Sequence, residues 1–291
     1  MKSIKYFFEF LSTISLLLTF KIIGFRNASN FGGAIGRIFG PLFRSKDITK
    51  KNIEIGLGKI SKEKENEIIN GMWSNIGRTF AEYAYLKDFR FNKLNFNHIN
   101  IVGINHLEKI KQKNEPVIFY SAHLANFELM AMELEKFGIK CAAIYRPLNN
   151  FFLNPLMEYL RIKYICPNQI PKGRVGMREI VNKFKNNYSI ALMVDQRVSE
   201  GPRVSFFGKP AHTTTIPAQL SLKYDCSLVP IFLERKNDLN FEMIVHEPYK
   251  IVKTGNSDKD INNITLKINQ TVEKMIIKNP TQWIWSHNRW K

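Results

Sequence analysis

The stretch VIFYSAHLANFELMAMELEKFG, residues 117–138, joins an apolar run to an amphipathic run through a short polar turn. Residues 117–120 are apolar and rich in strand-forming side chains, which predicts a buried strand. From Asn126, a residue type that caps helices, apolar and charged side chains alternate in a helical pattern. The chain must bend between the two runs, because five residues of one helix would hold His123 and Glu128 about 140° apart. His123 therefore ends a strand, and Glu128 lies in the first turn of the next helix.

The same succession of apolar and amphipathic runs recurs along the chain. It predicts strands at residues 116–122, 140–146, 189–195, 228–235 and 240–248. Helices are predicted across 47–90, near 154–164, after a glycine turn at 171–187 and at 261–279, and residues 204–226 are expected to form a loop that runs into a helix. Alternating strands and helices favour an α/β fold with a mostly parallel central sheet flanked by helices. Since no repeat or linker interrupts residues 47–291, we expect them to form one catalytic domain.

Polar side chains end three of the predicted strands: His123, Arg146 and Asp195. The carboxyl ends of parallel strands share one edge of a sheet, where ligands bind in α/β proteins. A carboxylate folded back from the following helix would fix the imidazole tautomer and stabilise an imidazolium, so we expect Glu128 to orient His123 as a general base.

Each of these residues also has a simpler interpretation. Glu128 is a favourable charge at a helix start, and Arg146 is a strand terminator. Asp195 is a surface ion-pair partner of Arg197 or Lys209. The coincidence of three such residues at one sheet edge favours a functional site.

A second candidate site lies at Gly173 and Arg174, which precede a predicted helix. Backbone N–H groups at a helix start and a guanidinium suit a phosphate group of a substrate. A tight turn with a solvated arginine explains the same residues.

The chain is strongly basic. Lys and Arg number 43 against 25 Asp and Glu, which gives a formal net charge of +18 over 291 residues. Such a charge favours nucleic acid, anionic membranes or acidic soluble proteins as partners. The sequence contains no zinc-finger spacing, no RNA-binding signature and no long basic helix, so we expect no nucleic-acid partner.

Metal and disulfide chemistry are not indicated by the sequence. Its three cysteines, Cys141, Cys166 and Cys226, are far apart and lack metal-ligand spacing, so we expect reduced thiols. No HExxH motif surrounds His123, and we expect no metal.

The amino terminus is the strongest compositional outlier. Residues 10–20 carry no charge, and a helix over residues 6–25 is about long enough to cross a bilayer with its charged ends at the surface. Residues 27–46 are rich in Gly and Phe with scattered Arg, which is typical of an interfacial pair of helices. A cleaved signal peptide is the rival interpretation, but no small-residue cleavage site follows. We therefore expect residues 1–46 to form an uncleaved membrane anchor with an interfacial segment.

Five motifs occur in a familiar order: HLANFE from His123, YRP from Tyr145, DQR from Asp195, FFGKPAHTT from Phe206, and the terminal TQWIWSHNRWK. In this combination the chain resembles the late acyltransferases of lipid A biosynthesis, the lauroyl and myristoyl transferases of the lysophospholipid-acyltransferase superfamily. The HxxxxE element is shared with glycerolipid acyltransferases. Family patterns usually read HxGNWE and HRRW, so Ala125, Phe127 and Asn288 depart from them.

The resemblance implies a glycerolipid-acyltransferase-like fold and an acyl-carrier-protein-dependent O-acyltransferase. His123 would act as the base on a hydroxyl of a lipid A precursor, and Glu128 would orient it. Arg146 would assist the reacting centre or hold phosphate, and Asp195 would support the site. The acyl donor would be acyl-acyl carrier protein, with no further cofactor and no metal.

The resemblance also implies partners and a location. Acyl carrier protein is acidic, and the phosphates of lipid A and of anionic inner-membrane lipids are further partners for a basic chain. The enzyme would lie at the bacterial inner membrane with its catalytic domain on the cytoplasmic face. Two alternatives remain: an acyltransferase for another glycolipid or glycerolipid, and a non-catalytic basic protein of the membrane surface. The terminal Trp283, Trp285 and Trp290 suit either substrate or interface contact or simple packing.

Overall fold

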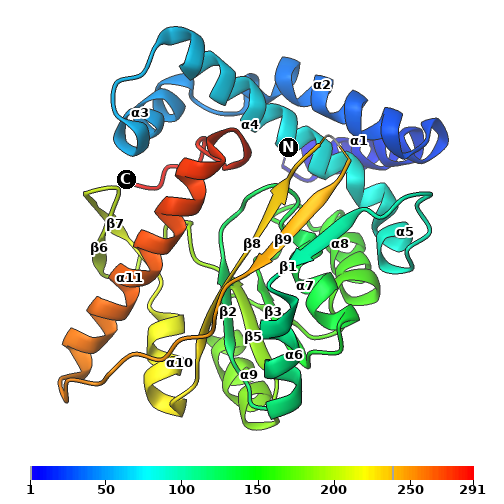
Figure 1. Cartoon of the computed structure of the whole chain (residues 1–291). Helices are drawn as coiled ribbons and strands as arrows, with labels where there is room; N and C mark the ends of the chain where they lie inside the picture. The colour runs from blue at the N-terminus through cyan, green and yellow to red at the C-terminus, as the bar shows by residue number, and fades with distance from the viewer. Residues whose placement is uncertain (1, 238) are drawn as a thin grey trace.

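The computed structural model describes residues 2–237 and 239–291, with only the backbone at Arg174. Within these residues, seven strands form a central sheet in the order β1-β9-β8-β2-β5-β3-β4 (Figure 1). The strands are β1 (Ile99–Val102), β2 (Ile118–Ser121), β3 (Cys141–Tyr145), β4 (Gln169–Pro171), β5 (Ser189–Met193), β8 (Leu228–Arg235) and β9 (Phe241–Val245). Neighbouring strands are parallel except β8 and β9, which pair antiparallel. The predicted mostly parallel sheet is confirmed.

Helices cover both faces of this sheet, as Figure 1 shows for α11 on one side and α7 and α8 on the other. The helices are α1 (Lys2–Ile23), α2 (Phe25–Phe43), α3 (Lys46–Leu57), α4 (Lys62–Glu82), α5 (Leu86–Arg90), α6 (Ile104–Lys113), α7 (Glu128–Lys136), α8 (Asn154–Leu160), α9 (Arg174–Lys185), α10 (Ile216–Tyr224) and α11 (Ser257–Lys278). Short helical turns η1 (Tyr83–Tyr85), η2 (Arg161–Ile165) and η3 (Pro280–Gln282) extend α4, α8 and α11.

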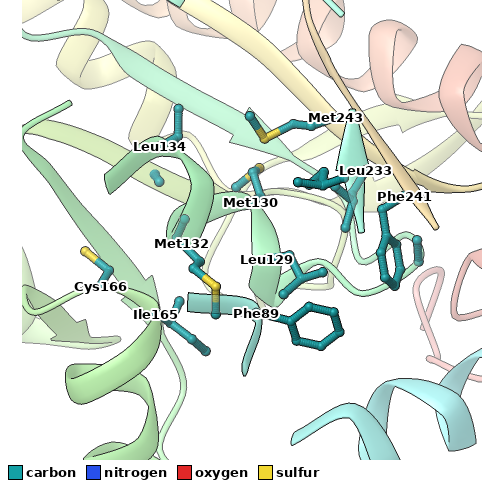
Figure 2. Packing of buried hydrophobic residues seen from close by; sticks show 14 of the residues in the cluster. Phe89, Leu129, Met130, Met132, Leu134, Ile165, Cys166, Leu233, Phe241 and Met243 are labelled. Carbon is teal, nitrogen blue, oxygen red and sulfur yellow. The ribbon is translucent and has the colours of Figure 1, made fainter. Parts of the chain in front are cut away.

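Alternate side chains of the strands enter two separate hydrophobic clusters. In β2, Phe119 joins the cluster under α5, α6 and α7, whereas Ile118 and Tyr120 join the cluster under α9, α10 and α11. Figure 2 shows the first cluster, in which Leu129 and Met130 of α7 lie against the sheet beside Phe89 and Phe241. Burial on both faces explains why the central strands read as continuous apolar runs rather than alternating ones.

The structure adds elements that the sequence did not reveal. β1 and β4 are edge strands of four and three residues, too short to give a recognisable pattern. The segment expected to be a loop before α10 contains an antiparallel hairpin, β6 (Arg203–Phe206) and β7 (Lys209–His212). Phe207 and Gly208 turn this hairpin, both with positive φ.

The first two helices meet at Gly24, whose φ of +81° breaks the helix between them. By length and composition, α1 is able to cross a membrane, with a mean hydropathy of 1.6. Its carboxyl end is also attached to the rest of the chain, since Phe20 is buried and its carbonyl accepts a 2.6 Å hydrogen bond from Tyr85. α1 is thus a candidate anchor that continues directly into the folded body.

Residues 27–46, expected as a pair of helices, form most of one helix, α2, which packs backbone to backbone on α4. A Cβ added at Gly36 would lie 2.1 Å from the carbonyl oxygen of Trp73, and one at Gly77 would lie 2.0 Å from that of Gly32. Only glycine permits this approach, so the predicted interfacial segment is held on the body of the protein.

Candidate active site

Three adjacent strands bring the predicted site residues to one edge of the sheet. β2, β5 and β3 are parallel neighbours, and His123, Asp195 and Arg146 follow them directly. A cavity of about 500 Å³ opens at this edge, and His123, Glu128 and Arg146 line it. The prediction that the three strand ends share one edge is confirmed.

His123 is held by Asp195. Its Nδ1 lies 2.7 Å from one carboxylate oxygen of Asp195, and its backbone N–H donates to the other oxygen at 3.1 Å. The indole of Trp283 donates to that second oxygen at 2.8 Å. Burial by itself would raise the pKa of Asp195, but the charge of His123 and these hydrogen bonds lower it to about 2. An ionised Asp195 accepts a hydrogen bond from Nδ1–H of His123, so Nε2 is the ring nitrogen that Asp195 does not bind.

Glu128 binds Arg161 and Tyr83 rather than His123. Its Oε1 accepts from Arg161 at 2.5 Å (Nη2) and 3.2 Å (Nε), and from the hydroxyl of Tyr83. Burial raises the pKa of Tyr83, and the Glu128 charge raises it further, so the hydroxyl remains a donor. Burial acts to lower the pKa of Arg161, but Glu128 more than offsets this, and the guanidinium stays charged.

The expectation that Glu128 orients His123 is therefore wrong: Asp195 makes that contact. The physical reason lies in the turn, where Ala125 adopts a φ of +49°. Glu128 then starts α7 facing η1 and η2. Asn126 is not the helix cap either, because Phe127 occupies that position and the Asn126 amide donates to Glu82 at 2.9 Å.

Arg161 was missed by the sequence analysis, although it lines the same cavity. It begins η2, a π-helical turn, a feature that is frequent at functional sites. An arginine inside an amphipathic helical run resembles any solvated charge, so the sequence offered no signal for it.

Two cations stand at the rim of the cavity. Arg146 is exposed there, and Lys172 is its neighbour. Partial burial lowers the pKa of Lys172, and the nearby charge of Arg146 lowers it further. Gly173 follows at the start of α9 with a φ of +133°, outside the cavity lining. The side chain of Arg174 lies outside the described part of the structure, so its predicted role is not tested.

The carboxyl-terminal segment packs against the site, where Trp283 binds Asp195 and His287 lines the cavity. Trp283 and Trp285 are buried, and the Trp290 indole donates to the carbonyl of Phe206 at 3.0 Å, which favours the packing interpretation for these tryptophans. Arg289 is fully buried and donates to the His212 carbonyl at 2.6 Å. His287, which the sequence analysis did not single out, lines the cavity.

Comparison with known proteins identifies the family to which this chain belongs. The whole chain, residues 1–291, matches the family described as bacterial lipid A biosynthesis acyltransferase. The chain belongs to this family. It is 25% identical over 271 residues to a lipid A biosynthesis palmitoleoyltransferase of Escherichia coli K12, covering 89% of this chain and 82% of the relative.

Two further relatives extend the similarity. A lipid A biosynthesis lauroyltransferase of E. coli K12 is 22% identical over 85% of this chain and 79% of its own length. A lipid A biosynthesis acyltransferase of Haemophilus influenzae is 23% identical over 88% of this chain and 83% of its own length. The resemblance found in the sequence motifs is confirmed.

Proposed function

We propose that this chain is a membrane-associated acyltransferase of lipid A biosynthesis, which transfers a fatty acyl chain from acyl-acyl carrier protein to a hydroxyl of a lipid A precursor. The observation that carries the proposal is the His123–Asp195 pair at the mouth of a cavity, in a chain of this family. An imidazole oriented by a buried carboxylate is the arrangement that general-base catalysis uses.

The reaction begins with proton transfer. Nε2 of His123 takes the proton from the acceptor hydroxyl while the hydroxyl oxygen bonds to the thioester carbonyl carbon. Asp195 stabilises the imidazolium that forms. The carbonyl electrons move to the oxygen and then return, the C–S bond breaks, and the imidazolium gives its proton to the departing sulfur. The products are an ester and a free carrier thiol, and in this proposal these steps are carried out without a metal or further cofactor.

Arg161 and the rim cations are suited to anionic parts of the substrates. Glu128 binds Nε and Nη2 of Arg161, and Nη1 has no hydrogen-bond partner among the described residues. In this proposal Glu128 acts by fixing Arg161, while Arg146 and Lys172 attract the phosphates of the acceptor.

The acyl chain has an apolar place to lie in the cavity. Its apolar lining side chains include Phe127, Met130, Ala131, Ala143, Ile144, Ile165, Ala191, Leu192, Met193, Ile216 and Ile284. A cavity of about 500 Å³ lies within the range of ligand sites in general.

Membrane association is supported by an exposed apolar surface formed by side chains of α1, α2 and the loop after β3. α1 exposes Phe8 and Ile22, α2 exposes Leu42 and Phe43, and the loop after β3 exposes Phe151. That loop is fastened to α1, since the Asn150 amide donates to the Tyr6 carbonyl at 2.9 Å and the rings of Phe151 and Tyr6 pack edge to face. Because Pro147, Leu148 and Asn149 of the same loop line the cavity, a bilayer at this surface would meet the cavity mouth.

We place the catalytic part on the cytoplasmic face of the inner membrane, where an acidic carrier protein meets a chain of net charge +18.

An acyl-transfer assay tests the proposal. Purified protein in anionic vesicles is given labelled acyl-acyl carrier protein and a lipid A precursor, in parallel with His123→Ala and the matched variant His106→Ala on α6. The proposal predicts transfer by the unmodified protein and by His106→Ala, with a loss of about 10² to 10⁴ in rate for His123→Ala. Equal rates for His123→Ala and the unmodified protein would remove His123 from the mechanism. Transfer to a different glycolipid alone would overturn the assigned acceptor.

A further inference from the structure

His287 lies in the same cavity as His123 but plays no part in the mechanism described above. Its Nε2 accepts a 3.1 Å hydrogen bond from the backbone N–H of Arg197, two residues after Asp195. Its carbonyl oxygen is fixed by the side-chain amide of Asn52 at 2.7 Å, and Asn52 also binds the carbonyl of Trp285. The imidazole is therefore held at both its ring and its backbone.

This arrangement determines the protonation of the ring. Because Nε2 accepts a hydrogen bond, the proton of a neutral imidazole must sit on Nδ1. Burial lowers the pKa of His287 to about 4, and the charge of Arg289 acts in the same direction against the opposing effect of Asp195. At neutral pH the ring is uncharged and Nδ1 is a donor.

The Nδ1 donor has no hydrogen-bond partner among the described residues. It is also absent from the fully buried polar atoms that lack a partner, so it is partly exposed, and the ring itself lines the cavity. A neutral donor that is oriented in advance and left open beside a general base is the kind of group that stabilises charge developing on a substrate oxygen.

We propose that His287 donates a hydrogen bond from Nδ1 to the carbonyl oxygen of the acyl thioester, and that this bond strengthens as the oxygen becomes negative in the tetrahedral intermediate. This inference rests on the proposed acyl transfer. In that step the acceptor oxygen bonds to the carbonyl carbon, His123 holds the proton, and the electron pair resides on the oxygen that His287 contacts. When the C–S bond breaks the pair returns to the carbonyl, and the Nδ1 proton never leaves His287.

Two amide variants, each of which reproduces one ring position of histidine, separate this role from a structural one. In His287→Asn a side-chain nitrogen lies in the position of Nδ1, so the donor is kept and the acceptor for the Arg197 N–H is lost. In His287→Gln a side-chain oxygen reaches the position of Nε2, so the acceptor is kept and the donor is lost. His106→Gln on α6, outside the cavity lining, is the matched control.

The kinetics of acyl transfer in anionic vesicles decide between the roles, with thermal melting of each variant to verify folding. We expect His287→Gln to lose about 10² to 10³ in kcat with little change in either KM, and His287→Asn to retain most of the rate. Full activity of His287→Gln, or loss confined to His287→Asn, would overturn the proposal and make His287 a support for the Arg197 loop. A rise only in the KM of the lipid acceptor would also overturn it. Absence of transfer by the unmodified protein would instead refute the proposed function.

Discussion

Replacement of Asp195 by asparagine substitutes an NH2 group for one carboxylate oxygen and removes the negative charge that holds His123. The carboxylate is 2% exposed and accepts hydrogen bonds from the His123 ring, the His123 backbone and Trp283. Its pKa is about 2 instead of the ordinary 3.8, so ionisation of this group contributes about 2 kcal/mol to folding at neutral pH. Because the folded pKa is the lower one, this contribution is complete above about pH 4 and is lost as the pH falls through about 2.

The variant Asp195→Asn should therefore be less stable by about 2 kcal/mol at pH 7 and should lose about 10² to 10⁴ in kcat, since the imidazolium is no longer stabilised and the Nδ1 tautomer is no longer enforced. Urea unfolding at pH 7 measures the first effect, and acyl transfer measures the second. Asp225→Asn is the control, because that carboxylate lies at the surface beside Lys250 and Lys253. A wild-type rate for folded Asp195→Asn would refute the assignment of Asp195 as the orienting group.

Three further predictions concern the parts around the dyad. Removal of either partner of the buried pair Glu128–Arg161, as Glu128→Gln or Arg161→Met, should cost about 3 to 5 kcal/mol by urea unfolding, and the double variant should cost much less than the sum. Gly36→Ala should destabilise the protein by about 1 to 3 kcal/mol, because its Cβ would lie 2.1 Å from a backbone oxygen of α4. Phe151→Ser should weaken binding to anionic vesicles by about tenfold in a flotation assay, since the ring is 54% exposed beside α1.

Matched variants make each of these results informative. Ile38→Ala on the exposed side of α2 is the control for Gly36→Ala, and equal melting temperatures for the two would contradict backbone contact between α2 and α4. Val252→Ser removes an 89% exposed side chain outside the two helices and the loop that form the apolar surface, and it should leave vesicle binding unchanged. Additive effects in the Glu128–Arg161 cycle would show that the two side chains do not stabilise each other.

The sequence predicted the features that depend on local pattern. Continuous apolar runs located β2, β3 and β5, and the rule that parallel strands end at one edge correctly placed His123, Arg146 and Asp195 together. The motifs predicted the family as well, because their order is preserved across the whole chain.

Contacts between distant segments were not predictable in this way. Glu128 lies five residues from His123, yet its partner Arg161 comes from η2, and the partner of His123 is Asp195, 72 positions along the chain. Proximity in sequence suggested the wrong pair because the turn at Ala125 directs Glu128 away from the imidazole. The same limit applies to His287, whose place in the cavity depends on the contacts of the terminal segment with Asp195 and Arg197, about 90 positions earlier in the chain.

The most direct test of the central claim is mass spectrometry of a total bacterial lipid extract after incubation with labelled acyl-acyl carrier protein and either the unmodified protein or His123→Ala. The extract contains every candidate acceptor, so the assay does not presuppose one. We predict that only the unmodified protein adds one labelled acyl chain, and that the product is an acylated lipid A precursor. The same product from both proteins would contradict catalysis by His123, and no labelled lipid from either would contradict acyl transfer by this chain.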